Sequence, residues 1–201
     1  MTQFSIIFLL ILCADSGLKL WLNLRQKHAI HKSFNQVPVP FDQHITLEEH
    51  QKAARYNLAK LTENRYELAY SALLVLIFTL GGGIDWIAQS FNLANYPLTS
   101  EVLLIVIYTL LNSLLALPFS YYSTFKIEQR FGFNNTTLKL FIVDLIKGTL
   151  LGLVIGVPLL YLVMWLMNNL GNQWWLWVWG VLVVFNLLIL IIYPTFIAPL
   201  F

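Results

Sequence analysis

The sequence predicts an all-α polytopic membrane protein with five transmembrane helices, and three observations lead to this fold class. Hydrophobic residues make up 58% of the chain and charged residues only 11%, whereas globular proteins average about 25% charged residues. The last 54 residues, 148–201, contain no Asp, Glu, Lys, Arg or His, which would leave a soluble helix pair without a solvated face. One bilayer crossing takes about 20 apolar residues. This stretch therefore has room for two crossings joined by the polar turn at 168–173.

The five crossings are expected in a single transmembrane domain spanning residues 1–201. Their predicted ranges are about 4–24, 66–88, 101–117, 138–167 and 174–193.

The second crossing is predicted to continue a longer juxtamembrane helix. The run TLEE at 46–49 fits a capping box, with Thr46 as N-cap and Glu49 three residues on. No Pro or Gly follows before Gly81, so one helix can run from the polar segment into the bilayer. Before it, the run VPVP at 37–40 predicts an extended connector, because proline disrupts helices. An uncharged loop is expected at 91–100.

The basic residues predict the orientation of the helices. Of the 12 Lys and Arg residues, 11 lie in the polar connectors at 25–65 and 118–137 or at the start of the fourth helix. The positive-inside rule then places both connectors and the C-terminus in the cytoplasm and the N-terminus outside. We expect an integral protein of a bacterial inner (plasma) membrane. The basic side chains are read as a solvated or lipid-facing surface, and no nucleic-acid partner is expected.

Motifs with recognisable chemistry are missing from the sequence. His28 and His31 stand three apart and could share a helix face, but neither His44 nor His50 fixes a third zinc ligand. Solvated histidines are the favoured interpretation. The sequence contains no HExxH, nucleophile elbow, Walker loop or Rossmann fingerprint. The residues alone therefore predict no catalytic, cofactor-binding or metal-binding residue in this chain.

Two patterns inside the predicted crossings concern packing. Asp15 and Lys19 stand four apart on one helix face, where a structural pair is favoured over a proton relay. Gly148, Gly152 and Gly156 form a doubled small-xxx-small face, which lets another helix approach closely.

Several irregular runs resemble one known family. They are YNLAK at 56–60, LPFSYYSTF at 117–125, IE at 127–128, RFGFN at 130–134, DLIK at 144–147 and IYPTFIAPLF at 192–201. These runs resemble segments of the type I CAAX prenyl proteases, the Ste-twenty-four family of integral-membrane zinc metalloproteases. The resemblance covers about residues 35–201.

The resemblance implies that this chain is the chamber-forming N-terminal membrane portion of a membrane zinc endopeptidase. The family's HExxH motif and its further glutamate ligand lie beyond the segment that matches 192–201, so no catalytic residue is carried over. Zinc and a peptide or protein substrate are expected for the full-length protein, a longer native chain is expected, and residues 1–201 alone are expected to be inactive. The alternative is a non-catalytic scaffold or regulator that uses the glycine face. A carrier or channel has little support, because five crossings without an internal repeat are not typical of one.

The resemblance also implies positions for three polar residues inside the crossings. Asn112, Asn186 and Asp144 would face water in the chamber, with ordinary interhelical contacts as the alternative for the two asparagines. Asp144 and Lys147 are expected to form a structural pair.

Overall fold

The computed structural model describes residues 2–39, 41, 43–91 and 97–200, and the regular elements of this described part are all helical. The predicted all-α fold class is thus confirmed. Four described helices are long and apolar enough to cross a membrane, and a fifth span is possible if the bent pair α2 and α3 makes one. The elements are α1 (Gln3–Ser33), α2 (Leu47–Thr79), α3 (Gly83–Ser90), α4 (Pro97–Tyr122), the π-helix η2 (Ser123–Glu128), α5 (Gln129–Phe131), α6 (Leu138–Asn169), the 3-10 turn η3 (Gly171–Gln173), α7 (Trp174–Ile192), the π-helix η4 (Tyr193–Ile197) and the 3-10 turn η5 (Ala198–Leu200).

The chain divides into two compact units. Unit 1 comprises Met1–Ile84 and Asn112–Asn135, and unit 2 comprises Asp85–Leu111 and Thr136–Phe201. Helix α4 therefore begins in unit 2 and ends in unit 1.

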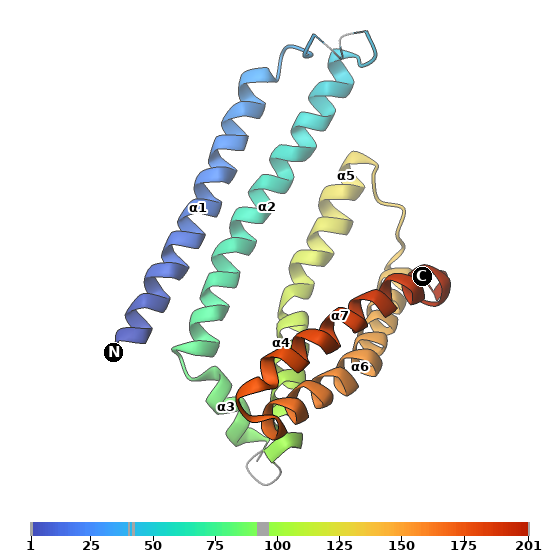
Figure 1. Cartoon of the computed structure of the whole chain (residues 1–201). Helices are drawn as coiled ribbons and strands as arrows, with labels where there is room; N and C mark the ends of the chain where they lie inside the picture. Colours follow the sequence, from blue (N-terminus) through green and yellow to red (C-terminus); the bar gives the residue numbers. More distant parts are fainter. Residues whose placement is uncertain (1, 40, 42, 92–96, 201) are drawn as a thin grey trace. The chain divides into compact units, whose positions relative to one another are not determined.

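In unit 1, α1 and α2 lie side by side (Figure 1). The buried Asn23 of α1 fixes their contact, because its Nδ2 donates to the carbonyl oxygen of Leu61 at 2.9 Å. Helix α1 continues to Ser33, well beyond the predicted crossing at 4–24, since no Pro or Gly interrupts the polar stretch that follows. Asp15 and Lys19 do share a helix face, and their charged atoms are 2.7 Å apart.

Helix α2 is the predicted juxtamembrane helix. Its capping box is present: the Thr46 hydroxyl accepts from the backbone N–H of Glu49, and a Glu49 carboxylate oxygen accepts from the backbone N–H of Thr46 at 2.9 Å. That backbone hydrogen bond, with the Thr46 hydroxyl second, lowers the pKa of the Glu49 carboxyl. The helix runs unbroken for 33 residues. It ends where Gly82 adopts a φ of 77°, a conformation that glycine takes without a steric penalty, and α3 begins directly after this break.

Most of the second polar connector is helical. From Leu98 to Phe131 the chain forms one helical stretch of 34 residues, which includes α4, η2 and α5. At 1.5 Å per residue this stretch is about 50 Å long, whereas the hydrocarbon core of a bilayer is about 30 Å thick. A substantial part of it therefore extends beyond the bilayer core. The loop expected at 91–100 is shorter than predicted, because α4 already begins at Pro97; residues 92–96 lie outside the described part of the chain.

In unit 2, α6 and α7 pack against each other (Figure 1). No residue of α7 is buried, as expected for an apolar helix whose surface faces lipid. The expected pair of Asp144 and Lys147 is not formed between these two described side chains. Instead, Lys147 Nζ donates to the carbonyl oxygen of Leu200 at 2.7 Å, and the buried Oδ1 of Asp144 has no hydrogen-bond partner among the described residues. Lys147 can reach the carbonyl of Leu200 because η4 and η5, which follow α7, bring this part of the backbone close to α6. The spacing of residues within α6 does not predict this contact.

Candidate functional site

A group of polar side chains in unit 1, joined by ion pairs and a hydrogen bond, lies where α2 contacts η2. Tyr56, Lys60 and Glu63 follow one another at spacings of four and three residues along α2, so they share one face of that helix. This face contacts η2, and the two elements run side by side in Figure 1.

Lys60 is the centre of a polar cluster, which we define as Lys60, Glu63, Ser123 and Glu128. Its ammonium nitrogen lies 3.5 Å from a carboxylate oxygen of Glu63 and 3.5 Å from one of Glu128. It also donates to the hydroxyl of Ser123. The Glu63 side chain is only 7% exposed, and the ammonium group beside it offsets the cost of burying this carboxylate without a partner. The cluster joins α2 to a segment more than 60 residues later in the sequence.

Aromatic rings form a second link between α2 and the connector. The Tyr56 ring packs edge-on against Phe131 at 5.5 Å and against Phe133 at 4.9 Å between ring centroids. The chain can place both rings there because Gly132, with a φ of 79°, ends α5 in a left-handed turn. The backbone N–H groups of Gly132 and Phe133 donate to the carbonyl oxygens of Gln129 and Glu128, which is the Schellman pattern at a helix end.

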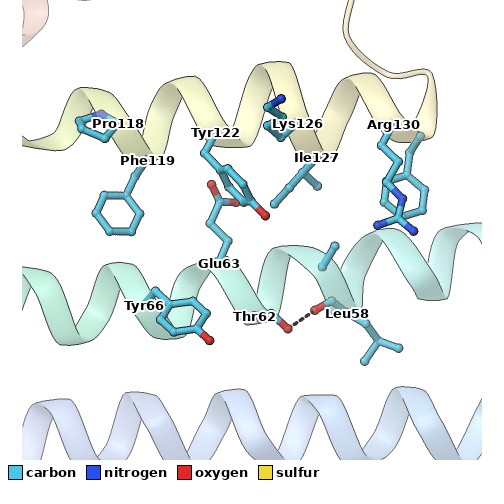
Figure 2. Close-up of a pocket in the computed structure, with 12 residues that line it drawn as sticks. Leu58, Thr62, Glu63, Tyr66, Pro118, Phe119, Tyr122, Lys126, Ile127 and Arg130 are labelled. Atoms are coloured by element: carbon cyan, nitrogen blue, oxygen red, sulfur yellow. Dashed lines mark hydrogen bonds between the residues drawn. The ribbon is translucent and has the colours of Figure 1, made fainter.

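A groove of about 670 Å³ opens beside this cluster within unit 1. Figure 2 shows Phe119, Tyr122 and Arg130 directed toward α2, and Glu63 rising from α2 toward Tyr122. The groove is lined by Leu58, Ala59, Thr62, Glu63, Tyr66, Pro118, Phe119, Tyr122, Lys126, Ile127, Arg130 and Phe131.

The groove and the cluster combine aromatic, basic and acidic side chains. In the described part of the chain, no three His, Cys, Asp or Glu residues come close enough to hold a metal ion. His50, one of the four histidines weighed as zinc ligands, instead donates through its ring Nε2 to the backbone carbonyl of Ser33 at 2.8 Å. Zinc therefore does not fit a site built from these described residues.

The structure also places the other residues singled out in the sequence. The side-chain amide of Asn186 donates to the carbonyl oxygen of Leu182 one turn earlier in α7, so this hydrogen bond lies within its own helix. A Cβ atom built at Gly148, Gly152 or Gly156 meets no described atom within 4 Å. The glycine face is thus not used for close packing within the described chain.

Sequence reasoning did not identify the cluster. It named none of Lys60, Glu63 or Ser123 as a site residue, although Lys60 and Glu128 lie within or beside the runs that carry the family resemblance. The available signal was the spacing of Lys60 and Glu63, an i, i+3 pair just before the bilayer. The pairing across the two connectors has no local signature, since it depends on how α2 and η2 pack.

Comparison with known proteins identifies the family. The CAAX prenyl protease N-terminal family, described as having five membrane helices, matches residues 26–201. The chain belongs to this family. The resemblance inferred from the irregular runs is confirmed, and the chain corresponds to the N-terminal membrane part of CAAX prenyl proteases.

Individual relatives agree with this assignment. A CAAX prenyl protease 1 homologue from Dictyostelium discoideum is 34% identical over 212 residues, covering 100% of this chain and 48% of the relative. A homologue of the same name from Caenorhabditis elegans is 32% identical over 200 residues, covering 98% of this chain and 44% of the relative. The crystal structure of S. mikatae Ste24p matches with a TM-score of 0.91 at 27% identity, covering 100% of this chain and 48% of that one. The chain thus spans about half the length of these relatives.

The two links between α2 and the connector therefore join the run at 56–60 to the three runs at 117–125, 127–128 and 130–134, on all of which the family resemblance rests. Tyr56 and Lys60 are the first and last residues of the run at 56–60, and their partners lie in the runs at 117–134. The family runs between residues 56 and 134 are therefore packed against one another in the structure, although they are separate in the sequence.

Proposed function

We propose that this chain supplies the membrane-spanning, chamber-forming half of a zinc metalloendopeptidase that cleaves membrane-associated peptides or proteins. The observation that carries the proposal is the family match over residues 26–201. The zinc ligands and the general base are assigned to the part of the full-length protein that corresponds to the unmatched half of the relatives. The role of this chain is to anchor the enzyme in the bilayer, with the polar cluster holding the connector at 118–134 in a fixed place against α2.

A chimaera tests this role. The half of S. mikatae Ste24p that this chain matches would be replaced by residues 1–201, and cleavage of a prenylated CAAX peptide in liposomes would be measured. We expect cleavage that a zinc chelator abolishes, as with unmodified Ste24p as the positive control. A chimaera that elutes as a folded monodisperse protein but does not cleave would contradict the proposal and favour the scaffold or regulator alternative.

The isolated chain provides the complementary test. Purified residues 1–201 are expected to show no zinc-dependent proteolysis, and reproducible chelator-sensitive cleavage by this chain would contradict the assignment of the chemistry to the other half. The intact mass of the native protein, compared with 23.2 kDa for 201 residues, would show whether both halves belong to one polypeptide.

The orientation is part of the proposal. The two basic connectors and the C-terminus are placed in the cytoplasm and the N-terminus outside, on the positive-inside rule. The bacterial inner membrane is a prediction that the eukaryotic relatives named above do not support. Reporter fusions after residues 35 and 200 should both be active in the cytoplasm, and activity of either fusion only on the outer face would reverse the topology.

A helix partner is proposed for the face formed by Gly148, Gly152 and Gly156. The open space beside a Cβ built at each glycine supports this, since small residues allow close helix approach in membranes. Replacement of Gly152 by Ile should abolish crosslinking between this face and its partner in native membranes. Unchanged crosslinking would remove the proposal.

A further inference from the structure

Two grooves of similar volume differ in their chemistry. The groove in unit 2, between α6 and α7, has a volume of about 680 Å³ and is lined almost wholly by apolar atoms, among them those of Trp177 and Val184. The groove in unit 1 has a volume of about 670 Å³ and combines aromatic walls with Lys126 and Arg130. A groove that presents both an apolar wall and cations fits an amphipathic anion.

The polarity of the unit 1 groove changes along its length. On the α4 side, the apolar run 102–117 leads to Phe119, and the cations follow at Lys126 and Arg130. With a helical rise of 1.5 Å per residue, the basic end lies roughly 15 Å beyond Phe119 along the helix. On the α2 side, Tyr66 lies nearest to the apolar half of the helix and Leu58 farthest from it. Figure 2 shows the same order, with Phe119 and Tyr66 at one end of the groove and Arg130 and Leu58 at the other. From the sequence, we expect the first end to lie toward the bilayer and the second toward water.

The charges around the groove leave one cation in excess. Among the charged residues that line the groove, Lys126 and Arg130 are positive and Glu63 is negative, and beside it Lys60 and Glu128 carry opposite charges. Lys60 is committed to the two carboxylates at 3.5 Å. Within the described part of the chain, neither Lys126 nor Arg130 forms an ion pair. A ligand with a single negative charge, bound at Lys126 and Arg130, would neutralise this excess positive charge.

We infer that the unit 1 groove binds one anionic glycerophospholipid. Its phosphate lies at Lys126 and Arg130, and an acyl chain follows Tyr122, Phe119 and Tyr66 toward the bilayer core. Basic pockets between transmembrane helices are a recurrent form of lipid head-group recognition. A lipid is favoured over a peptide for two reasons. Along both helices the groove changes from charged to apolar in the direction in which the bilayer already orders a lipid, from head group to acyl chain. The single negative charge of the lipid also matches the one positive charge in excess at the groove.

Lipid titration followed by native mass spectrometry tests the inference. The 201-residue chain would be delipidated in detergent and titrated with phosphatidylglycerol or phosphatidylcholine of equal chain length. We expect one phosphatidylglycerol to bind with an affinity about tenfold or more above that for phosphatidylcholine, because each basic group near the surface attracts an anionic lipid by about 1 kcal/mol. Equal affinity for the two lipids would overturn the inference.

Matched variants locate the site. The double variant Lys126→Gln/Arg130→Gln should lose most of the preference for phosphatidylglycerol, whereas Lys27→Gln/Lys32→Gln, which removes the same charge from α1, should retain it. Both pairs of changes are in side chains that are at least partly exposed, so unchanged thermal unfolding is expected to show that the variants fold. If the groove double variant binds phosphatidylglycerol as the parent does, the site lies elsewhere and the inference fails.

Further arms separate the other possible occupants. Tyr66→Ser should weaken binding of the lipid, while glycerol 3-phosphate and inorganic phosphate should compete poorly, because they carry the anion without the acyl chain. Competition by free phosphate at the concentration of the lipid would overturn the lipid assignment in favour of a simple anion site. An apolar peptide with a free C-terminal carboxylate that binds more tightly than phosphatidylglycerol would overturn it in favour of a peptide groove.

Discussion

The two π-helices in the described part of the chain have different surroundings. In η2 the Gln129 N–H donates to the Thr124 carbonyl, and in η4 the Ala198 N–H donates to the Tyr193 carbonyl, so both contain the i→i−5 hydrogen bond of a widened turn. Segment η2 contains no proline and is bordered by the polar cluster and the Tyr56 ring. Segment η4 contains no charged residue, and its second residue is Pro194.

The difference leads us to infer that one backbone distortion can arise from tertiary contacts or from local sequence. Proline lacks the N–H that would complete an α-helical turn, and its ring crowds the carbonyl four residues earlier. In η4 we expect this local effect to widen the turn; next to Pro194, the Thr195 hydroxyl donates to the carbonyl of Ile191 at 2.7 Å. In η2 the widened turn instead accompanies side chains that reach α2. Removing those contacts should therefore affect η2 strongly, and removing the proline should affect η4 locally.

The largest effect is expected for Lys60→Met. This change leaves the carboxylate of Glu63, which is 7% exposed, and that of Glu128 without their shared cation. We expect the free energy of unfolding of unit 1 to fall by about 2–4 kcal/mol, less than for a fully buried pair, because Lys60 and Glu128 are about a third exposed. Reversible denaturation in mixed micelles would measure this loss. The triple variant Lys60→Met/Glu63→Gln/Glu128→Gln should recover most of it, and a single variant as stable as the parent would show that ion pairing does not hold η2.

A smaller effect is expected for Tyr56→Ala. The variant loses two edge-to-face ring contacts, each of which contributes about 0.5–1.5 kcal/mol beyond the buried area. We expect a loss of about 1–3 kcal/mol and faster amide hydrogen exchange at 129–134, since these contacts hold the end of the connector. Tyr56→Phe keeps the ring at position 56 and both of its ring contacts, and it is the matched control. Equal exchange in Tyr56→Ala and Tyr56→Phe would mean that the rings do not hold this segment.

Pro194→Ala should change the structure of η4 more than the stability of the protein. Alanine restores an N–H donor for the carbonyl of Leu190, so the π-turn should relax to an α-helix, with a change in stability of about 1 kcal/mol or less. Cysteine accessibility at 195–197 would detect the rotation of Ile197 out of its buried position. Persistence of the parent accessibility pattern would mean that packing in unit 2, rather than the proline, maintains η4.

The smallest effect concerns the start of α2, the helix that presents Lys60 to η2. Because the Thr46 backbone N–H lowers the pKa of Glu49, the cap stabilises α2 fully above the ordinary pKa of a glutamate carboxyl. That stabilisation is lost as the pH falls through the lowered folded-state pKa. Protection of the amides at 47–50, measured relative to their intrinsic exchange rates, should fall in this acidic range in the parent and show no such pH dependence in Glu49→Gln. An identical pH profile in the two proteins would contradict the assignment.

The sequence by itself determined the membrane-spanning helices, the start of α2 and the family. These follow from local properties: the absence of charge over 148–201, the capping box at Thr46 and Glu49, and runs of residues that are adjacent in the chain. Such features need no knowledge of distant neighbours, because hydration of charges and backbone capping act within a few residues.

Only the tertiary structure decided which side chains meet. Lys60 and Ser123 are 63 residues apart in the sequence, and nothing local to either predicts that they pair. The error over Asp144 and Lys147 has the same origin: their spacing allowed a pair, but the fold offered Lys147 the carbonyl of Leu200, 53 residues away. Spacing along one helix reveals only the partners on that helix, whereas partners on other elements depend on how the chain folds.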